Sequence, residues 1–507
     1  MIVPQSTMLA QKTVDARKTG VFDAASFIAA NMDIVDFCIT SRKIQLRMEG
    51  TPAPLTAAGD LTIEQRLHEP FGRFQDVVMQ QQAVAEVKDD KLMRASLRDA
   101  LGMSALYEGA ISYLVYGGAG LPRFRFLTKE SPRERIARTQ KGMRAIPAAF
   151  EKCLPPKSSK LRDLLERIHV FTQTEAYRVL RGSSAALPSA TRATMLRSRI
   201  LTPLSRIYAV KKSYLSPFIN AAQSAAAQDA FEAIANIDEI FAYAHFTGKL
   251  PELSDQVEHF VRATALYNWP QAALTPPNRQ SSPFIPFNID LGQNERLTFL
   301  TGPNSGGKTS LSKALIHAAV QTQMGMPVHA FRYATTVADR IFYIVGEGNH
   351  LQSTEGSMGE QLKRIKYEFE HATPRSFGIL DEMIEGTSYL EKMEHTADLL
   401  CGFNHIGAHI IYSSHMLELA RAFQAENIGA FQQMGFVDDK PTYEVLPGIA
   451  TTSGFDALTD RVKFHRDAMT ESLVERGYLE QGADLRSPRH NSRPERDSKA
   501  LAQHSQK

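Results

Sequence analysis

A glycine-rich segment in the second half of the chain carries residue types that can hold phosphate. It reads RLTFLTGPNSGGKTSLSKALIHAAV, in which a short apolar run precedes the glycines and a helical pattern follows them. The pattern G-x-x-x-x-G-K-[ST] is satisfied by Gly302, Pro303, Asn304, Ser305, Gly306, Gly307, Lys308 and Thr309. Glycines let backbone N–H groups close around an anion, and the following helix presents its positive end to it. The segment therefore predicts a phosphate-binding loop between a strand and a helix.

Two polar residues open the predicted helix. Lys308 has the charge and the reach to contact the β and γ phosphates of a nucleotide, and the hydroxyl of Thr309 suits Mg²⁺. Ser310 follows in the same helical turn, and we include it in the predicted nucleotide site. A glycine turn that precedes a helix by chance is the alternative, but strand, loop and helix all occur in the expected order.

A second chemical signal is the apolar run SFGIL, which ends in two acids, Asp381 and Glu382. In a parallel sheet, an acid that directly follows a buried strand is placed beside the phosphate loop. There Asp381 would hold Mg²⁺, and Glu382 would orient or deprotonate an attacking water. An apolar run that ends in Asp-Glu means little alone, but it is a strong signal when paired with the loop.

A third apolar run, AHIIYSSH at residues 408–415, ends in His415. Its topology would bring the imidazole near the γ phosphate. A histidine at the end of a strand is more often a surface residue or a satisfied core residue. This one occupies the position at which P-loop ATPases of the ABC kind carry a residue that senses the γ phosphate, so we predict a switch role.

Together these motifs resemble the ATPase domain of MutS mismatch-repair proteins. The resemblance rests on LTGPNSGGKTS, ADRIFYIVG, FGILDEMIEGTS and IIYSSHMLEL, in this order, and on the looser TTSGFDAL after Gly448. It covers roughly residues 265–460. Upstream, IEQRLHEPFGRFQDVVMQQQAVAEV resembles the beginning of the MutS core and lever domain, and FEAIANIDEIFAYAHF resembles the helix that returns towards the ATPase.

The resemblance implies a fold and a set of roles. The fold is an α/β P-loop (ABC-type) ATPase domain preceded by a mostly α-helical core and lever domain. The roles carried over are a phosphate loop at Gly302, Asn304, Gly307, Lys308 and Thr309, a Mg²⁺ residue at Asp381, a catalytic carboxylate at Glu382 and a switch at His415. Phe284 matches a family aromatic that stacks on adenine, although an ordinary core phenylalanine is equally consistent.

The sequence departs from the family in two places that matter. Where the family has a Ser-Thr-Phe-Met signature that reaches the ATP of the other subunit, this chain reads TEGSMGEQ. Ser357 is the best counterpart and Ser353 the second. Only about sixty residues precede the core-like helices, too few for the family's mismatch-reading and connector domains. Direct recognition of a mispaired base is therefore not implied.

The elements that position these residues fall into four segments. Apolar residues recur at helical spacing from about residue 61 to 255, and a segment rich in Pro, Ser and Asn at 274–288 introduces short strands alternating with helices. Beyond Glu480 the apolar content is very low. We expect a lead-in at 1–60, a helical domain at 61–265, an ATPase domain at 266–475 and a disordered polar tail at 476–507.

Basic residues gather in the helical part. From Arg178 to Lys212 the chain has eight Lys and Arg and no acid, and a second cluster runs from Arg123 to Arg144. A solvated helix surface and a contact with DNA are both consistent with either cluster, but the absence of acids in the first favours phosphate contact. The predicted DNA-binding residues are Arg192, Arg197 and Arg199.

Composition sets the remaining bounds. The 507 residues are 43% hydrophobic and 22% charged, as expected for two or three globular domains, and the net charge is only +3. Cys38, Cys153 and Cys401 stand far apart without a CxxC pair, which disfavours a disulfide framework or a zinc site and fits a reducing cytoplasm. We expect no signal peptide and no membrane span.

The sequence therefore predicts a cytoplasmic, Mg²⁺-dependent ATPase that acts as a homodimer on duplex or structured DNA, at the nucleoid if bacterial. Mismatch repair is the first expectation. The second is a MutS relative that clamps junctions or recombination intermediates, which the missing mismatch-reading domain would favour. The third is a nucleotide-gated protein scaffold with little turnover, against which Glu382 argues.

Overall fold

The computed structural model of the chain describes residues 54–115, 132–182, 208–246, 248–256, 259–267, 285–292, 295–303, 306–346, 357–383, 388–437, 440–451, 462 and 466–482. The chain divides into two compact units, Met1–Thr451 and Thr452–Lys507. Within the described part of the second unit lies helix α19 (Arg466–Glu475), which has no buried residue. The first unit holds the candidate site.

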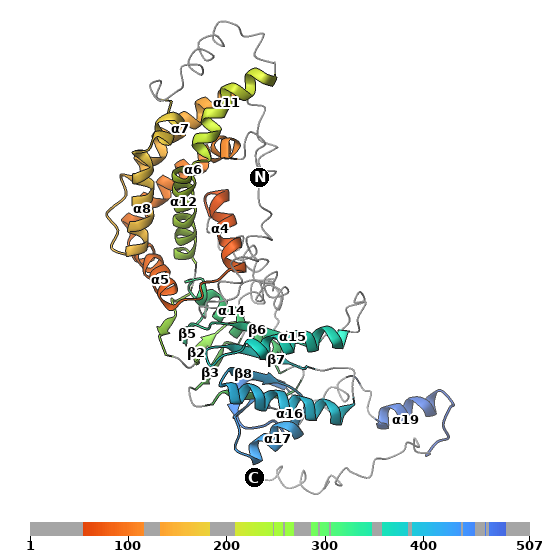
Figure 1. Ribbon diagram of the computed structural model, residues 1–507. Coiled ribbons are helices and arrows are strands. Elements are labelled where there is room, and N and C mark those ends of the chain that lie inside the picture. The colour runs from red at the N-terminus through yellow and green to blue at the C-terminus, as the bar shows by residue number, and fades with distance from the viewer. Residues whose placement is uncertain are drawn as a thin grey trace. The chain divides into compact units, whose positions relative to one another are not determined.

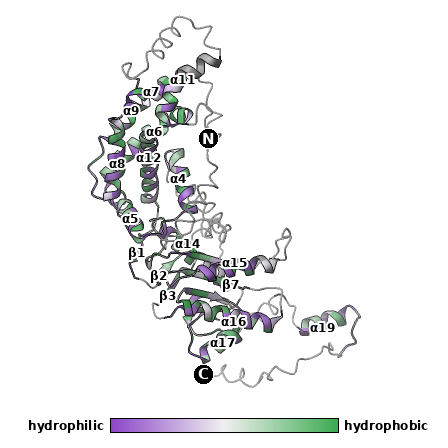
Figure 2. Ribbon diagram, viewed as in Figure 1, coloured by the Kyte–Doolittle hydropathy of each residue, from purple (hydrophilic) through white to green (hydrophobic). Residues whose placement is uncertain are grey.

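The first half of the described chain is helical (Figure 1). Its helices are α4 (Ala57–His68), α5 (Phe74–Asp89), α6 (Lys91–Val115), α7 (Pro132–Phe150), α8 (Ser159–Thr172), α9 (Glu175–Leu180), α11 (Tyr208–Ala222) and α12 (Ala225–Ala244). Apolar and polar residues are interspersed along these helices (Figure 2), and their apolar sides pack together in one core. Leu97, Leu101 and Phe241 are fully buried there. Within the described residues, no helix is long and apolar enough to cross a membrane.

Two sheets follow the helices. The four-stranded sheet has the order β1-β5-β2-β3, and it consists of β1 (Glu252–Ser254), β5 (Arg332–Thr336), β2 (Val261–Leu266) and β3 (Phe287–Leu291). The six-stranded sheet consists, in spatial order, of β10 (Lys440–Pro447), β9 (Ala430–Val437), β4 (Leu297–Thr301), β8 (His409–Ser413), β7 (Phe377–Asp381) and β6 (Ile341–Val345). Neighbouring strands of this sheet are parallel except for β10, which is antiparallel to β9.

Within the described residues, four helices accompany the six-stranded sheet: α14 (Lys308–Gln323), α15 (Ser357–His371), α16 (Tyr389–Ile406) and α17 (Leu417–Ala425). The expected order, a helical region followed by an α/β domain, is confirmed. Strands β1 and β2 begin before residue 266, where the sequence placed the start of the second domain. Neither strand has a long apolar run that the sequence would reveal. Both are strands because they pair with β3 or β5, which lie far away in the sequence.

The six-stranded sheet is buried on both faces. One face shares a core with α14 and the four-stranded sheet, and Leu311 and Ile379 belong to it. The other face packs on α15, α16 and α17, with Phe342 and Phe403 among the buried residues. Every residue of β4, β7 and β8 is buried, which explains why these strands read as continuous apolar runs. Because the strands are parallel, the residues that follow them meet at one edge of the sheet.

The carboxyl end of α14 contacts the helical region. The backbone N–H of Phe71, between α4 and α5, donates to the carbonyl oxygen of Gln323 at 3.0 Å. Just beyond, Gly325 has a φ of +73°, and a Cβ there would collide with the side chain of Gln80 in α5. The helix that begins at the glycine-rich loop therefore ends against the helices of the first half.

Candidate nucleotide site

The glycine-rich loop connects β4 to α14. Gly302 and Gly307 have φ angles of +137° and +96°, in a region that other residues rarely adopt. A Cβ on Gly302 would lie 3.0 Å from the Cβ of Met434, and one on Gly307 would lie 2.9 Å from the ring of Tyr443. Both neighbours come from the β9–β10 hairpin. Conformation and space thus both require glycine at these two positions.

Lys308 begins α14, and its ammonium group turns back into the loop. Nζ donates to the carbonyl oxygens of Gly302 (2.8 Å) and Pro303 (3.2 Å), and the residue is buried. Burial lowers the pKa of Lys308 to about 8, although Glu382 and Asp381 act in the opposite direction. A buried ammonium group held by neutral carbonyls is incompletely compensated, so an anion in the loop would stabilise it.

Asp381 ends β7, and it is buried. Its Oδ2 accepts hydrogen bonds from the hydroxyl groups of Thr309 (3.3 Å) and Tyr343 (3.2 Å). Thr309 follows Lys308 in α14, and Tyr343 comes from β6. Strand β8 lies between β4 and β7, so the strand that carries Asp381 is not the direct neighbour of the strand that precedes the loop. The carboxylate nevertheless reaches the hydroxyl with which it was expected to share a Mg²⁺ ion.

Glu382 and His415 meet beside Lys308. Nε2 of His415 lies 2.7 Å from Oε1 of Glu382, and this hydrogen bond lowers the pKa of Glu382. The ionised carboxylate can only accept, so Nε2 carries the hydrogen. Nζ of Lys308, 3.2 Å from the same nitrogen, therefore directs its hydrogen bonds to the carbonyls. The imidazole of His415 thus contacts both the ammonium group of Lys308 and the carboxylate of Glu382.

The backbone of Glu382 is itself unusual. Its φ is +52°, which is uncommon for a residue with a side chain. Its N–H donates to the carbonyl oxygen of Ser413 at 3.0 Å, which ties the end of β7 to the end of β8. This tie places the side chains that follow the two strands next to each other.

The structure brings together most of the predicted site. The residues that converge are Gly302, Pro303, Gly306, Gly307, Lys308, Thr309, Asp381, Glu382 and His415, with Ser310 in the first turn of α14. The predicted residues that lie outside the described part are Phe284, Asn304, Ser305, Arg192, Arg197 and Arg199. Ser357 is the first residue of α15, and its side chain lies outside the described part.

Sequence reasoning did not single out two tyrosines near these residues. Tyr343 carries a hydroxyl group in the otherwise apolar strand IFYIV, which is a signal that a closer reading can find. Tyr443 stands beside Gly307 with a φ of +61°. Its placement depends on a register shift in the β9–β10 pairing, for which the sequence has no local marker.

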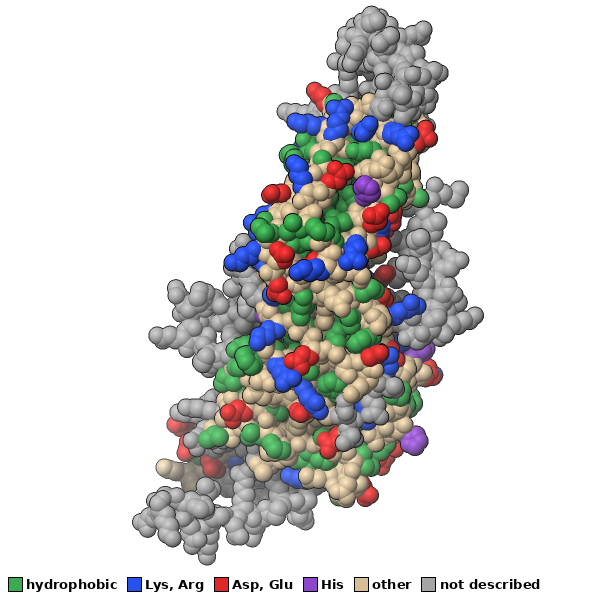
Figure 3. All heavy atoms as spheres, turned by 90° about the vertical axis from the view of Figure 1, so that its left-hand side faces the viewer, with side chains coloured by type: hydrophobic (Ala, Val, Ile, Leu, Met, Phe, Trp, Pro, Cys, Tyr) green, Lys and Arg blue, Asp and Glu red, His purple; other side chains and the backbone are tan. Residues whose placement is uncertain are grey.

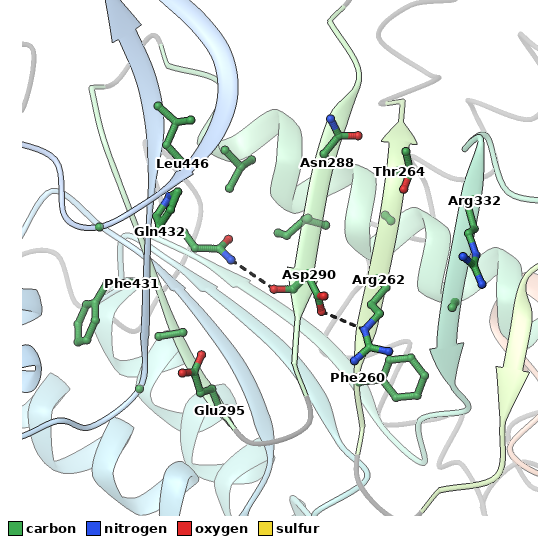
Figure 4. Close-up of a pocket in the computed structure, with 18 of the residues that line it drawn as sticks. Phe260, Arg262, Thr264, Asn288, Asp290, Glu295, Arg332, Phe431, Gln432 and Leu446 are labelled. Atoms are coloured by element: carbon green, nitrogen blue, oxygen red, sulfur yellow. Dashed lines mark hydrogen bonds and ion pairs between the residues drawn. The ribbon is translucent and has the colours of Figure 1, made fainter.

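A separate cleft of about 980 Å³ opens over the exposed face of the four-stranded sheet (Figure 4). Two ion pairs join neighbouring strands of this sheet on the wall of the cleft: Arg262 with Asp290 (3.2 Å, Figure 4) and Arg332 with Glu252 (2.8 Å). Among the described residues, none of the loop, acid or histidine residues of the candidate site lines this cleft. Because its arginines are neutralised by their own neighbours, it lacks the uncompensated positive charge found at Lys308.

Comparison with known proteins bears directly on this site. Residues 298–446 match the family model for MutS domain V. The DNA mismatch repair protein MutS of Desulforamulus reducens is 35% identical over 140 residues, which are 27% of this chain and 16% of that protein. Endonuclease MutS2 of Thermus thermophilus is 28% identical over 196 residues, 38% of this chain and 26% of that protein. The probable DNA mismatch repair protein Msh6 of Drosophila melanogaster is 26% identical over 200 residues, 38% of this chain and 16% of that protein.

The matched segment begins within β4 and ends within β10. It includes the glycine-rich loop, both acids and His415, so it contains every described residue of the candidate site. The chain spans about a sixth to a quarter of the length of these relatives. The similarity to MutS domain V therefore covers residues 298–446 of this chain.

Proposed function

We propose that the chain binds ATP with Mg²⁺ at the loop between β4 and α14 and hydrolyses it. The observation that carries this proposal is the convergence of five side chains from the ends of β4, β7 and β8. They are Lys308, Thr309, Asp381, Glu382 and His415. Transfer of a phosphoryl group from a nucleotide to water uses a cation that binds the phosphates, oxygen ligands for Mg²⁺ and a carboxylate that positions the water. These side chains can supply all three.

Each side chain has a part in this reaction. Lys308 and the N–H groups of the loop bind the phosphates, whose charge replaces the carbonyl contacts of the ammonium. Thr309 and Asp381 offer the oxygen ligands that Mg²⁺ prefers, and the ion would neutralise phosphate charge. Glu382 orients a water molecule and accepts its proton, and His415 holds the carboxylate in place.

The direct test replaces Lys308. We expect Lys308→Ala to lose productive ATP binding, because the ammonium group that faces the phosphates is gone. Titration with a fluorescent ATP analogue measures the affinity, and Lys313→Ala, an exposed lysine on the same helix, is the matched control. Unchanged affinity in a folded Lys308→Ala protein would remove the assignment of the site.

We propose further that nucleotide binding gates contact with DNA, in mismatch repair. Two of the relatives named above are DNA mismatch repair proteins by name. In the described part, Arg138, Lys141 and Arg144 recur every third residue on the exposed side of α7. Lys and Arg side chains stand close together towards this end of the helical region (Figure 3). The proposed phosphate contacts in the acid-free segment are Arg192, Arg197 and Arg199.

The DNA structure that the protein binds distinguishes between two proposed functions of the ATPase. Binding to homoduplex, mismatched, branched and single-stranded DNA, with and without ATP, separates mismatch repair from the clamping of recombination intermediates. A protein that binds none of these in either state would instead act as a nucleotide-gated scaffold. Work on DNA would place the protein in the cytoplasm, at the nucleoid in a bacterium.

The active form is proposed to be a homodimer. The support is the segment TEGSMGEQ, which contains Ser357, the first residue of α15, and which stands where the family has a signature that contacts the partner's nucleotide. ATP and Mg²⁺ should therefore strengthen self-association of Glu382→Gln, which retains its nucleotide. Sedimentation as a monomer at all concentrations under these conditions would contradict the dimer.

A further inference from the structure

One oxygen of Asp381 accepts hydrogen bonds from two hydroxyl groups that belong to different elements. Oδ2 accepts from Thr309, at the start of α14, and from Tyr343, in the middle of β6. Tyr343 is 8% exposed, and its ring lies in the core shared by α14 and the sheet. In the register of β6 and β7 it pairs with Ile379, two residues before Asp381, so its hydroxyl extends along the sheet towards the site.

The two hydroxyl groups are not equivalent. Thr309 is exposed, and its oxygen is the one expected to turn to Mg²⁺. Tyr343 is fixed by its strand and by the surrounding core. When Thr309 coordinates Mg²⁺, Tyr343 is therefore the one of these two donors that can still donate its hydrogen bond to Oδ2. We propose that Tyr343 is a positioning residue, which orients the Asp381 carboxylate for Mg²⁺; this inference rests on the proposed ATPase function.

A phenol suits this task better than a charged partner. Burial, together with the nearby Asp381, raises the pKa of Tyr343 far above its ordinary value, so the group remains a neutral donor. A lysine or arginine in its place would neutralise the carboxylate and compete with the cation. A neutral hydrogen bond fixes the orientation of the carboxylate and leaves its negative charge available to the metal.

The test removes the hydroxyl and keeps the ring, with Tyr343→Phe. Loss of a group that orients a metal ligand typically weakens metal affinity by about 10- to 100-fold. We expect the Mg²⁺ concentration at half-maximal nucleotide binding, measured with a fluorescent ATP analogue, to rise by this factor. Nucleotide affinity in excess EDTA should stay at the wild-type value, because Lys308 and the loop are untouched. Tyr333→Phe, a buried tyrosine of β5 in the same core, should change neither quantity.

A double-mutant cycle separates positioning from packing. In an Asp381→Asn background, Tyr343→Phe should have no further effect on the Mg²⁺ dependence, because the carboxylate that it orients is gone. A packing role would instead add the same penalty in both backgrounds, and that result would overturn the inference. The same holds for an unchanged Mg²⁺ dependence in Tyr343→Phe alone.

Two further measurements keep the outcome decisive. If Tyr343→Phe does not fold, Tyr343→Gln and Tyr343→Leu replace it, and the donor-bearing glutamine should retain more Mg²⁺ affinity than the leucine. Equal loss in both would overturn the inference. Wild-type protein that binds no nucleotide with or without Mg²⁺ would contradict the proposed function itself, whereas normal wild-type binding with an unaltered variant would contradict only the role of Tyr343.

Discussion

Two buried acidic clusters, one in the helical region and one at the edge of the six-stranded sheet, use the same residue types in opposite ways. In the helical region, Asp238 of α12 is fully buried. It accepts hydrogen bonds from the backbone N–H groups of Leu55 (3.0 Å) and Thr56 (2.7 Å) and from the Thr56 hydroxyl (2.7 Å). The carboxylate is thus satisfied by groups of its own chain.

A second acid completes this cluster. Glu108 of α6 accepts from the backbone N–H groups of Ala57 (2.8 Å) and Ala58 (2.7 Å), in the first turn of α4. Together the two acids cap the positive end of α4. A Cβ on Gly59 would collide with Asp238, so α4 packs tightly on this carboxylate. The cluster is closed in the sense that groups of the chain itself satisfy both acids.

The cluster at the sheet edge is open by comparison. Lys308 rests on backbone carbonyls, Asp381 receives only hydroxyl groups, and Glu382 is held in a left-handed conformation. Burial of charge therefore does not by itself identify a functional site. The useful distinction is whether the chain supplies the complementary charge or leaves it to a ligand.

The largest expected effect lies in the open cluster. Replacing Glu382 with Gln should slow ATP hydrolysis by roughly 10² to 10⁴, because the proton acceptor is lost, while ATP binding is preserved. Steady-state phosphate release measures the rate. Glu394→Gln, an exposed acid on α16, should hydrolyse normally. Turnover of Glu382→Gln at the wild-type rate would make Glu382 structural, and the contrast between the clusters would disappear.

The closed cluster should respond in stability instead. Asp238→Ala leaves the N–H groups of Leu55 and Thr56 without their acceptor, which should lower the free energy of unfolding by about 3 kcal/mol. Urea denaturation measures this loss. Asp290→Ala breaks an exposed ion pair and should cost less than about 1 kcal/mol. If Asp238→Ala changed ATP turnover but not stability, the cluster would have been misassigned.

Acidification should change the stability of the two regions in opposite directions. Burial raises the pKa of Asp238 to about 6, so its contribution to stability is complete below pH 3.8 and is lost as the pH rises through 6. Burial lowers the pKa of His409, at the start of β8, to about 4. Its contribution is therefore complete above pH 6.5 and is lost as the pH falls through 4. The helical region gains stability on acidification, and the sheet loses it.

The histidine effect can be isolated by substitution. His409 faces His259 and Arg296, and Arg375 also acts on His259, so an added proton would meet positive charge. Between pH 7 and pH 5, His409 should cost the wild type roughly 2 kcal/mol of stability. In His409→Gln this part of the pH dependence should vanish. Parallel stability curves for the two proteins over that range would show that folding does not lower the pKa of His409.

The smallest effect per residue is expected on DNA. Neutralising Arg192, Arg197 and Arg199 should flatten the dependence of log K on log salt by about 0.9 for each phosphate that the protein no longer neutralises. ATP affinity should be unchanged. A salt titration on one duplex measures the slope, with the α7 triple Arg138, Lys141 and Arg144 tested alongside and Arg332→Gln as a paired-charge control. Slopes equal to wild type in both triples would mean that these basic residues only face solvent.

The sequence was most informative where function depends on residues close together in the chain. The glycine-rich loop, the acids after β7 and His415 are local patterns, because each follows a fully buried parallel strand. Contacts between distant segments were not predicted. Asp238 meets Thr56 across 182 positions, and Tyr343 meets Asp381 from another strand. Such pairs depend on how helices and strands pack, for which a single sequence contains no direct signal.

The length of helix α14 has a mechanical consequence of its own. With 16 residues, α14 is a rod about 24 Å long. One end carries Lys308 and Thr309, and the other end is fastened to Phe71 and fitted against Gln80. A continuous helix of this length moves largely as a rigid body, so a translation or rotation of one end also displaces the other. Any displacement of its first turn would therefore be transmitted, at the far end, to α5 and the segment before it.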